Sequence, residues 1–333
     1  MKKVLFLILL SPIFFTGVDA QQGVNQFKIL KSIPLPGDGG WDYSIVDTVY
    51  HRLFVTHETM VQVIDLHTNK LVGTISELNG VHGVTFAFPF NHGFLSNGDA
   101  NSIIMFDLKT LKVIKKIKST GEGPDAIIYD PYSKNVYAFN GDSRSATVIN
   151  AENGEVVTTV DLEGSPEFAV ADGKGGLFVN LEKESQLLKL NTTTFAIENK
   201  WNLAPGEGPT ALALDASNHR LFSACRGNKG MSVINEMNGE TLAILPIGQG
   251  VDAIRYDANR HLIFVSNKDG SLDIFHQESA DKYSRIQVLK TKYHSKTMAF
   301  DPKTQLLYLA SADFINKKSI KPGSFAILVV GKK

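Results

Sequence analysis

Short apolar runs alternate with turn-forming residues along most of the chain, and this pattern recurs about every 42 residues. One unit opens at Pro124-Asp125, and its first apolar run ends at Asp130. The four apolar runs of this unit lie at 126–129, 136–139, 146–149 and 155–160. Four short strands separated by turn residues are typical of one blade of a β-propeller.

The position five residues before Asp130 gives a register for the whole repeat. It recurs with gaps of 40, 43, 42, 43, 42 and 44 residues, at Asp42, His82, Asp125, Glu167, Thr210, Asp252 and Lys296. The Asp130 position itself recurs at Asp47, Asp172, Asp215, Asp257 and Asp301, and only the second unit differs, with Ala87. We therefore predict an all-β fold, a seven-bladed β-propeller of four-stranded antiparallel blades.

The two ends of the repeat array each depart from the pattern. The last unit reaches a third apolar run, 325–330, and has no fourth. An apolar segment at 27–33 precedes the first unit and belongs to none. We predict that this N-terminal strand completes the last blade and closes the ring, which leaves no unpaired sheet edge at the join. The stretch 311–324 is expected to be a solvated loop between the second and third strands of that blade.

Residues 1–20 have the pattern of a cleavable signal peptide. Two lysines precede an apolar run, 4–15, and small residues follow up to a cleavage site after Ala20. The apolar run is shorter than the roughly 20 residues that span a bilayer. We therefore expect residues 21–333 to form a single propeller domain that is periplasmic or secreted, with no membrane span after the signal is cleaved.

The charge of the chain argues against one class of partner. Without the first 20 residues, which hold two lysines and one aspartate, the 34 basic and 34 acidic residues become 32 and 33. A near-neutral protein lacks the positive field that drives non-specific nucleic-acid binding, so we do not expect nucleic acid as a partner. The lone cysteine, Cys225, has no second cysteine in the chain for a disulfide. We expect a monomer.

The seven register residues from Asp42 to Lys296, here called the mouth ring, are the candidate ligand-binding set. In a propeller the first strand of each blade lines the central channel, and the loops that enter these strands gather at one face. Crowded carboxylates share protons or bind a cation, so the sequence predicts a pocket for a polar ligand or a divalent cation. The alternative is that these side chains satisfy backbone N–H groups at the strand starts or face channel water.

A second set of residues ends the second strands, near the same face. Its members are His57, Asn97, Asn140, Asn180, Cys225, Asn267 and Ser311. Asn at such positions usually caps a turn, which is the simpler interpretation; alternatively, the set borders a ligand held by the mouth ring. Arg144 and Arg226 follow this set closely, and they either clamp an anionic group or are surface charges.

No catalytic signature accompanies these two sets. The chain has no His-Glu-x-x-His motif, no Gly-x-Ser-x-Gly motif and no phosphate loop. We therefore favour a non-catalytic exported protein that acts as a binding or scaffold protein and presents the channel mouth to a small ligand or a protein partner. An enzymatic alternative stays open, by analogy of fold: a lactonase-like hydrolase with His82 as base and Asp125 as ligand, or an oxidoreductase accessory subunit.

The turn motifs of the repeat also point to a family. They are Gly-x-Gly-Pro-Asp at 121–125, Ser-Pro-Glu at 165–167 and Gly-x-Gly-Pro-Thr at 206–210, with strand pairs that end in Asn. In these features the chain resembles the YncE-like, YVTN-type seven-bladed propellers, which are mostly exported bacterial proteins. The literal YVTN tetrapeptide is replaced by runs such as 264–267, FVSN. The resemblance implies the fold and export, and one relative suggests single-stranded DNA binding as a further alternative.

Overall fold

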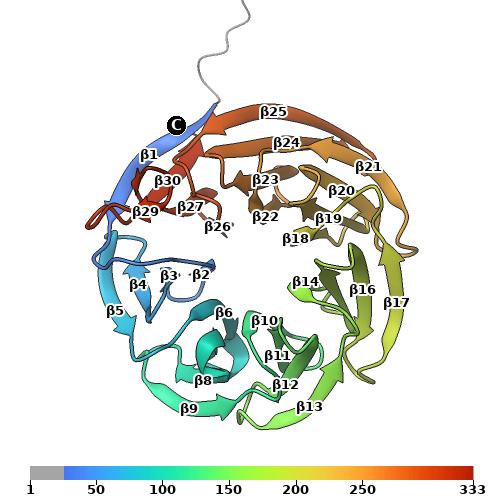
Figure 1. Ribbon diagram of the computed structural model, residues 1–333, viewed down its shortest axis with the longest axis horizontal. Coiled ribbons are helices and arrows are strands. Elements are labelled where there is room, and N and C mark those ends of the chain that lie inside the picture. The colour runs from blue at the N-terminus through green and yellow to red at the C-terminus, as the bar shows by residue number, and fades with distance from the viewer. Residues whose placement is uncertain (1–25, 333) are drawn as a thin grey trace, which may run out of the picture.

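The computed structural model describes residues 26–332, so the predicted signal peptide, 1–20, and its cleavage site after Ala20 lie outside the described part. Seven four-stranded sheets are arranged as blades around a central channel (Figure 1). The predicted seven-bladed propeller of antiparallel blades is therefore confirmed. Over the described residues, no helix is long and apolar enough to cross a membrane.

Six blades use four consecutive strands, and the first strand of each lies innermost (Figure 1). Blades 1 to 3 contain β2 (Ser44–Asp47), β3 (Arg52–His57), β4 (Met60–Asp65), β5 (Lys70–Ile75), β6 (Val81–Ala87), β7 (His92–Asn97), β8 (Ser102–Asp107), β9 (Val113–Lys118), β10 (Pro124–Asp130), β11 (Asn135–Asn140), β12 (Ser145–Asn150) and β13 (Val156–Asp161). Blades 4 to 6 contain β14 (Pro166–Ala171), β15 (Gly176–Leu181), β16 (Gln186–Asn191), β17 (Ile197–Asn202), β18 (Pro209–Asp215), β19 (Arg220–Cys225), β20 (Gly230–Asn235), β21 (Thr241–Pro246), β22 (Val251–Asp257), β23 (Leu262–Asn267), β24 (Ser271–Ser279) and β25 (Lys282–Lys290).

The seventh blade joins the two ends of the chain, as predicted. It consists of β26 (Met298–Asp301), β27 (Leu306–Ser311), β30 (Ala326–Lys332) and β1 (Phe27–Pro34). β1 pairs antiparallel with β30 along its length, with one bulge near its middle. The backbone N–H and C=O of Phe27 also bond to the Gln287 side chain of β25, at 2.9 and 2.8 Å. Hydrogen bonds between distant parts of the chain therefore close the ring.

One aromatic side chain in the middle of each second strand fills the contact with the next blade. These residues are Phe54, Phe94, Tyr137, Phe178, Phe222, Phe264 and Tyr308, all 2% exposed or less. Phe54 of β3, for example, packs on Phe86 of β6 with ring centroids 4.9 Å apart. Burying such a ring stabilises by roughly 1.5–3 kcal/mol, so the regular spacing in sequence becomes a regular stacking of blades.

The repeated aspartate shapes the turn from the first strand to the second. In blade 3 the Asp130 carboxylate accepts the backbone N–H groups of Tyr132 at 3.1 Å and Ser133 at 3.0 Å. Because this cap is local, it sets the turn wherever the acid recurs. Blade 2 has Ala87 at this place, and there a short 3-10 helix, η1 (Phe88–Phe90), replaces the capped turn. A second such helix, η2 (Gly98–Ala100), follows β7.

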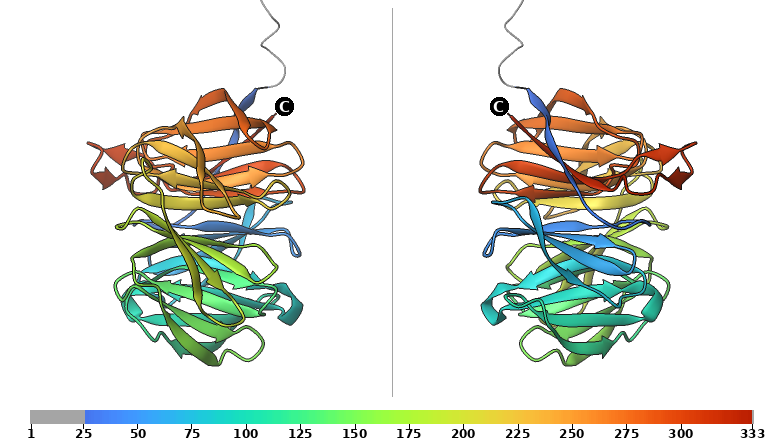
Figure 2. Two further views of the ribbon diagram at one scale, coloured as in Figure 1. Left: turned by 90° about the vertical axis from the view of Figure 1, so that its right-hand side faces the viewer. Right: turned by 90° about the vertical axis from the view of Figure 1, so that its left-hand side faces the viewer.

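The stretch 311–324 differs from the solvated loop that we expected. It contains β28 (Phe314–Ile315) and β29 (Ser319–Ile320), a two-stranded hairpin that projects from one face of the ring (Figure 2). The Phe314 ring stacks on His294, with centroids 4.9 Å apart and planes at 19°. Lys292 also donates to the Asp313 carboxylate at 2.8 Å. Both partners lie in the connection from blade 6 to blade 7, so tertiary contacts hold the hairpin in place.

Candidate functional site

The mouth-ring residues project into the channel because the first strands are bulged there. In blades 2 to 6 the pairing of the first and second strands shifts register across the mouth-ring position. In β10, for example, Asp125 and Ala126 lie between the paired residues Pro124 and Ile127. A bulge bends the strand and re-aims a side chain, and bulges are common at the rims of closed sheets. In these five blades the bulge therefore re-aims the mouth-ring side chain, whereas Asp42 and Lys296 of blades 1 and 7 lie just before β2 and β26.

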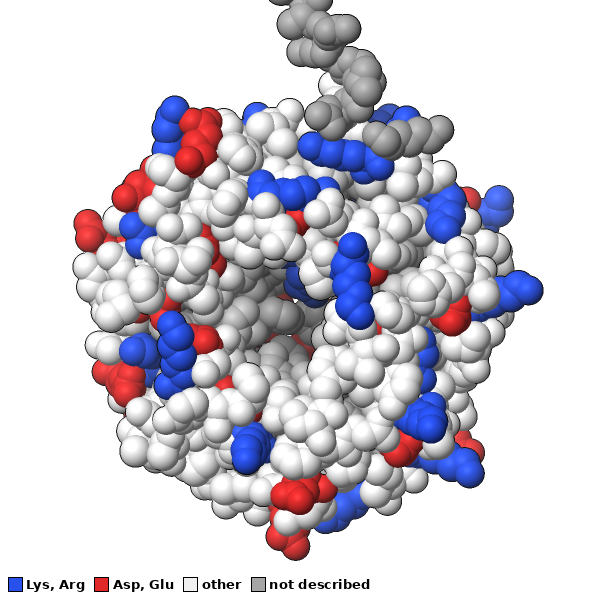
Figure 3. All heavy atoms as spheres, turned by 180° about the vertical axis from the view of Figure 1, so that it is seen from behind, with Lys and Arg blue, Asp and Glu red and all other residues white. Residues whose placement is uncertain are grey.

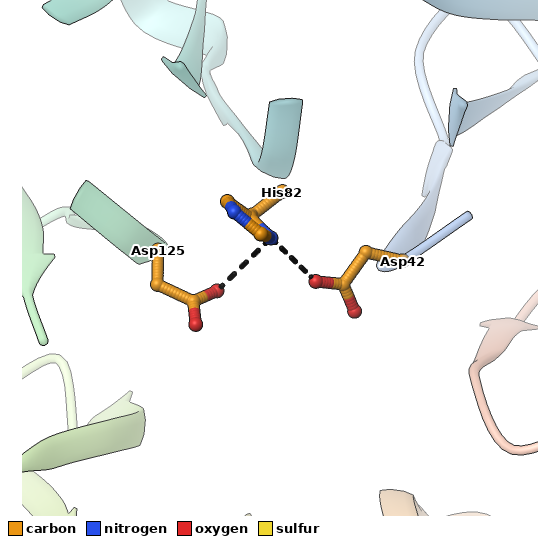
Figure 4. Close-up of side chains that lie close together, drawn as sticks. All are labelled: Asp42, His82 and Asp125. Atoms are coloured by element: carbon orange, nitrogen blue, oxygen red, sulfur yellow. Dashed lines mark hydrogen bonds and ion pairs between the residues drawn. The ribbon is translucent and has the colours of Figure 1, made fainter. Parts of the chain in front are cut away.

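Three of these side chains converge on one another. His82 Nδ1 lies 2.8 Å from an Asp42 carboxylate oxygen and 3.8 Å from Asp125 Oδ1, so the imidazole stands between two carboxylates from neighbouring blades (Figure 4). One donor atom from each residue lies within 4.8 Å of the others. Gly98 gives the ring room, since a Cβ at that position would lie 2.8 Å from the imidazole. We call this set the Asp42–His82–Asp125 cluster.

The proton on the imidazole compensates the two carboxylates. Burial lowers the pKa of His82, but the hydrogen bond to Asp42 and the charge of Asp125 outweigh it and raise the value to about 9. Burial and then the charge of Asp42 raise the pKa of Asp125 to about 7, and burial also raises that of Asp42. At neutral pH His82 is therefore an imidazolium. A protonated imidazole has no lone pair for base catalysis, which argues against the hydrolase role considered for His82.

Asp125 has an oxygen that this arrangement does not satisfy. Its Oδ1 is buried and accepts no hydrogen bond from any residue of the described part of the chain. The distance of 3.8 Å to His82 Nδ1 is an ion pair and too long for a hydrogen bond. A buried carboxylate oxygen without a donor costs free energy unless a cation or water approaches it. The cluster is therefore prepared for a positively charged partner.

The other side of the mouth ring is already neutralised by cations. Asp252 is buried and contacts both Arg226 at 2.6 Å and Lys296 at 2.5 Å. Arg226 also lies 3.4 Å from Glu167 and 3.3 Å from Glu182. Lys296 thus compensates a ring carboxylate. Arg226 binds three carboxylates of the mouth and is a structural ion of the site, whereas Arg144, 54% exposed and paired with Glu184, is the surface charge.

The remaining two ring residues border this network. Burial, followed by the charges of Asp125 and Glu182, raises the pKa of Glu167 to about 9, although Arg226 opposes the shift. Thr210 is buried and donates its hydroxyl to the Gly208 carbonyl at 3.1 Å. Six of the seven predicted ring positions are therefore ionisable side chains, divided between the Asp42–His82–Asp125 cluster and the ion pairs around Asp252 and Arg226. Thr210 bonds to a backbone carbonyl, so it does not satisfy a backbone N–H group as the alternative proposed.

Deeper in the channel lie three large side chains that the sequence did not single out. The rings of Tyr43 and Phe168 have centroids 5.4 Å apart, and the Arg255 guanidinium lies 5.9 Å from the Phe168 centroid. They line a cavity of about 100 Å³. Burial lowers the pKa of Arg255 to about 10. From the face opposite the hairpin, the centre of the ring is hollowed, and acidic and basic side chains are interspersed around it (Figure 3).

A second cavity opens beside the Asp42–His82–Asp125 cluster. It measures about 350 Å³, and His82 and Asp125 form part of its wall. Its other charged wall residues are Asp99, Glu122 and Asp142, without any Lys or Arg. We call it the acidic cavity. It connects the cluster to solvent through an environment that favours cations and repels phosphates, which argues against nucleic acid at this position.

The second set of residues is buried inside the blades. His57, Asn97, Asn140, Asn180, Cys225, Asn267 and Ser311 are all 2% exposed or less. Asn97 Oδ1 accepts the backbone N–H of Asn79 at 2.6 Å, and Asn180 Nδ2 donates to the Ala211 carbonyl at 3.2 Å. The first bond ties β7 to the connection that leads into β6 of the same blade, and the second ties β15 to β18, the first strand of the next blade. The set supports the mouth ring from behind and is closed to a ligand in the channel.

The charged residues that we did not anticipate share a sequence position. Asp99, Asp142, Glu182 and Lys268 each stand one or two places beyond the end of a second strand, the position that Arg226, named in the sequence analysis, also has. This position begins the loop that leads toward the channel mouth, so a charged residue there in successive blades indicates a charged mouth. The sequence analysis instead selected the last residues of the second strands, and these residues are buried and have a structural role.

Neither a protein-family model nor a curated protein sequence matches the chain. Solved structures do. The WD40 repeats of RRP9 superpose with a TM-score of 0.78 at 8% identity, and a U3-55K structure with 0.77 at 8%; each comparison covers 90% of this chain and 97% of the other. Hydrazine synthase of Kuenenia stuttgartiensis gives 0.75 at 12% identity, with the same coverage. At such identities the likeness concerns the fold alone, and it agrees with a seven-bladed β-propeller.

Proposed function

We propose that the protein is an exported, YncE-like binding propeller whose channel mouth takes up a divalent metal ion at the Asp42–His82–Asp125 cluster. The bound ion would offer its open coordination positions to a small polar ligand or a protein partner. The observation that carries the proposal is the convergence of three donor atoms within 4.8 Å, one of them the unsatisfied Asp125 Oδ1. Export rests on the N-terminal sequence pattern.

The donor set fits a first-row transition metal. Such ions bind imidazole nitrogen and carboxylate oxygen at about 2.0–2.2 Å, which keeps ligand atoms roughly 3–4 Å apart. The His82 contact of 3.8 Å with Asp125 lies within that range, and the contact of 2.8 Å with Asp42 lies slightly below it. Three protein ligands leave at least one position for water or a ligand. In the metal-free protein the His82 proton occupies the place between the carboxylates, so binding must release that proton.

A metal titration tests the proposal. The chelator-treated protein is melted at pH 8 with Zn²⁺, Mn²⁺, Mg²⁺ or Ca²⁺, and we expect Zn²⁺ or Mn²⁺ to raise the melting temperature most because of the imidazole ligand. An ion at 100 times its Kd stabilises by about 2.7 kcal/mol. Asp42→Asn, His82→Gln and Asp125→Asn should each remove the shift. Binding measured by calorimetry in two buffers should release close to one proton per ion.

Two controls make the result specific. Glu152→Gln changes an exposed acid in the turn between β12 and β13, and should keep the full shift. Glu167→Gln removes a mouth-ring carboxylate outside the cluster and should keep most of it. A shift that survives all three cluster substitutions, or no shift with any ion, contradicts the assignment.

A further inference from the structure

A larger cavity lies on the other side of the channel mouth, next to the β28–β29 hairpin. It measures about 510 Å³ and lies against blades 5 and 6. Three of its wall residues are cations, Arg226, Lys268 and Lys317, and Tyr293 adds an aromatic ring. We call it the basic cavity. Its volume is enough for a small organic molecule, since ligand pockets typically measure about 300–1,000 Å³.

Two of these cations lack acidic partners. Over residues 26–332, neither the Lys268 nor the Lys317 ammonium has a carboxylate oxygen within 4.0 Å. The one acid in the wall, Asp269, is engaged by other donors: its oxygens accept the backbone N–H groups of Gln249 at 2.7 Å and Ser271 at 3.0 Å. Within the described residues the two lysine ammonium groups are therefore unpaired, and Asp269 is the one negative charge in the wall.

The aromatic wall of the basic cavity is held rigidly. The Tyr293 ring contacts His294 and Phe314 edge to face, at centroid distances of 5.2 and 5.3 Å. Phe314 in turn lies 6.2 Å from Trp41. Lys317, at the hairpin tip, places its ammonium 5.7 Å from the Tyr293 centroid. The hairpin thus holds a cation above an immobilised ring, and this pairing stabilises the ammonium without neutralising it.

The neighbouring histidine responds to the same positive field. His294 stands between the basic cavity and Lys296, and burial together with the charges of Lys268 and Lys296 lowers its pKa to about 4. At neutral pH it is uncharged. Because the His294 ring is neutral, the positive charges in and around the cavity are those of the lysines and Arg226.

From this geometry we propose that the basic cavity binds an organic anion. Lys268 and Lys317 hold the carboxylate or phosphate group, and the apolar body of the ligand packs against Tyr293. Arg226 also lines the cavity but is paired with Glu167, Glu182 and Asp252, so the two lysines supply the positive charge that a ligand meets. This site does not depend on the metal proposed for the opposite side of the mouth.

Phenyl phosphate, benzoate and inorganic phosphate serve as probes, titrated into the metal-free full-length mature protein and followed by calorimetry and ligand-observed NMR. We expect one of the two aromatic anions to bind at a single site, at least tenfold more tightly than inorganic phosphate, since the ring adds buried apolar area. Lys268→Gln with Lys317→Gln should weaken binding at least tenfold. Tyr293→Leu should reduce the preference for the aromatic anions and leave inorganic phosphate unchanged.

The control variant is Lys109→Gln, which removes an exposed lysine of blade 2 and should bind as the unchanged protein does. The proposal is overturned if neither aromatic anion binds at millimolar concentration, or if the double lysine variant binds as tightly as Lys109→Gln does. Circular dichroism and melting curves establish that each variant is folded, so that a loss reports the cavity.

Discussion

The acidic and basic cavities flank the same channel mouth but carry opposite charge. The acidic cavity is built from positions that every blade has, namely the mouth ring and the loops after the second strands. The basic cavity depends on the β28–β29 hairpin, which only the seventh blade has. Symmetric repeats alone would give equivalent pockets around the ring. The difference shows that a change of charge in the loops, together with one inserted hairpin, is enough to give the mouth one acidic side and one basic side.

Neutralising the charges of one site should strongly weaken binding at that site and leave the other site intact, and this is the largest effect that we expect. Asp42→Asn with Asp125→Asn should weaken metal binding about 100-fold, equivalent to about 2.7 kcal/mol, and change phenyl phosphate binding less than twofold. Lys268→Gln with Lys317→Gln should do the reverse. Calorimetric titration of both ligands into both variants measures this. If each double variant loses both ligands, the two cavities form a single site.

Arg226 lies in the wall of the basic cavity and also pairs with three carboxylates of the mouth. Arg226→Gln leaves Glu167 and Glu182 without this cation and leaves Asp252 to Lys296 alone. Because Arg226 is 41% exposed, water screens part of the loss, and we expect the free energy of unfolding to fall by about 1–2 kcal/mol. Urea denaturation measures it. Arg144→Gln, which breaks the exposed pair with Glu184, should change it by less than about 0.5 kcal/mol.

The pH dependence of stability between pH 5 and 9 should come mainly from three mouth-ring groups, His82, Asp125 and Glu167. His294, whose pKa is lowered from 6.5 to about 4, opposes them only below pH 6.5. His82 has its pKa raised from 6.5 to about 9, so its contribution is present below pH 6.5 and lost as the pH rises toward 9. Asp125 and Glu167 have pKa values raised from 3.8 to about 7 and from 4.5 to about 9, so their ionisation also favours the unfolded chain as the pH rises. Stability of the metal-free protein should therefore decline between pH 5 and 9.

We expect this decline to be the smallest of the three effects, because the His82 and Asp125 side chains are 36% and 32% exposed and water screens most of each shift. A residual effect of about 1 kcal/mol corresponds to roughly 2–4 °C in melting temperature for a large domain. Scanning calorimetry from pH 5 to 9 measures it. Asp125→Asn combined with Glu167→Gln should flatten the curve, and saturating metal should flatten or invert it. A variant of the basic cavity, Lys268→Gln, should keep the slope of the unchanged protein. An apo protein that becomes more stable toward pH 9 would contradict the protonation of the cluster.

Much of the fold followed from spacing. The recurrence of Asp130 predicted the turns because an Asx cap involves only the next three residues. The pairing of β1 with β30 was predicted because the array has an extra strand at its N-terminal end and lacks a fourth strand in its last unit. The hairpin at 314–320 was missed, because Phe314 is held by His294 and Tyr293, and nothing in its own sequence names those partners.

The candidate site was predicted only in part. The mouth ring was found as a set of equivalent positions, but its members are not equivalent: Asp42, His82 and Asp125 form one cluster, while Asp252 is neutralised by cations. Arg226, for which a surface charge was one of two open interpretations, is the centre of an ion network, because its carboxylate partners come from blades 4 and 6, on either side of its own blade 5. Such groupings depend on distances across the channel, which residues far apart in sequence determine together.

The sequence periodicity was therefore sufficient to predict the propeller fold, its number of blades and the N-terminal strand that closes the ring. Strand alternation and turn capping depend on neighbouring residues, and the closure follows from the number of strands in each unit. The chemistry of the mouth required the folded chain. Charges that are 40 or more residues apart meet at the axis, and their protonation depends on burial and on neighbours from other blades. For this protein the repeat specifies where a ligand can approach, and the three-dimensional arrangement of unlike charges gives the mouth an acidic and a basic side.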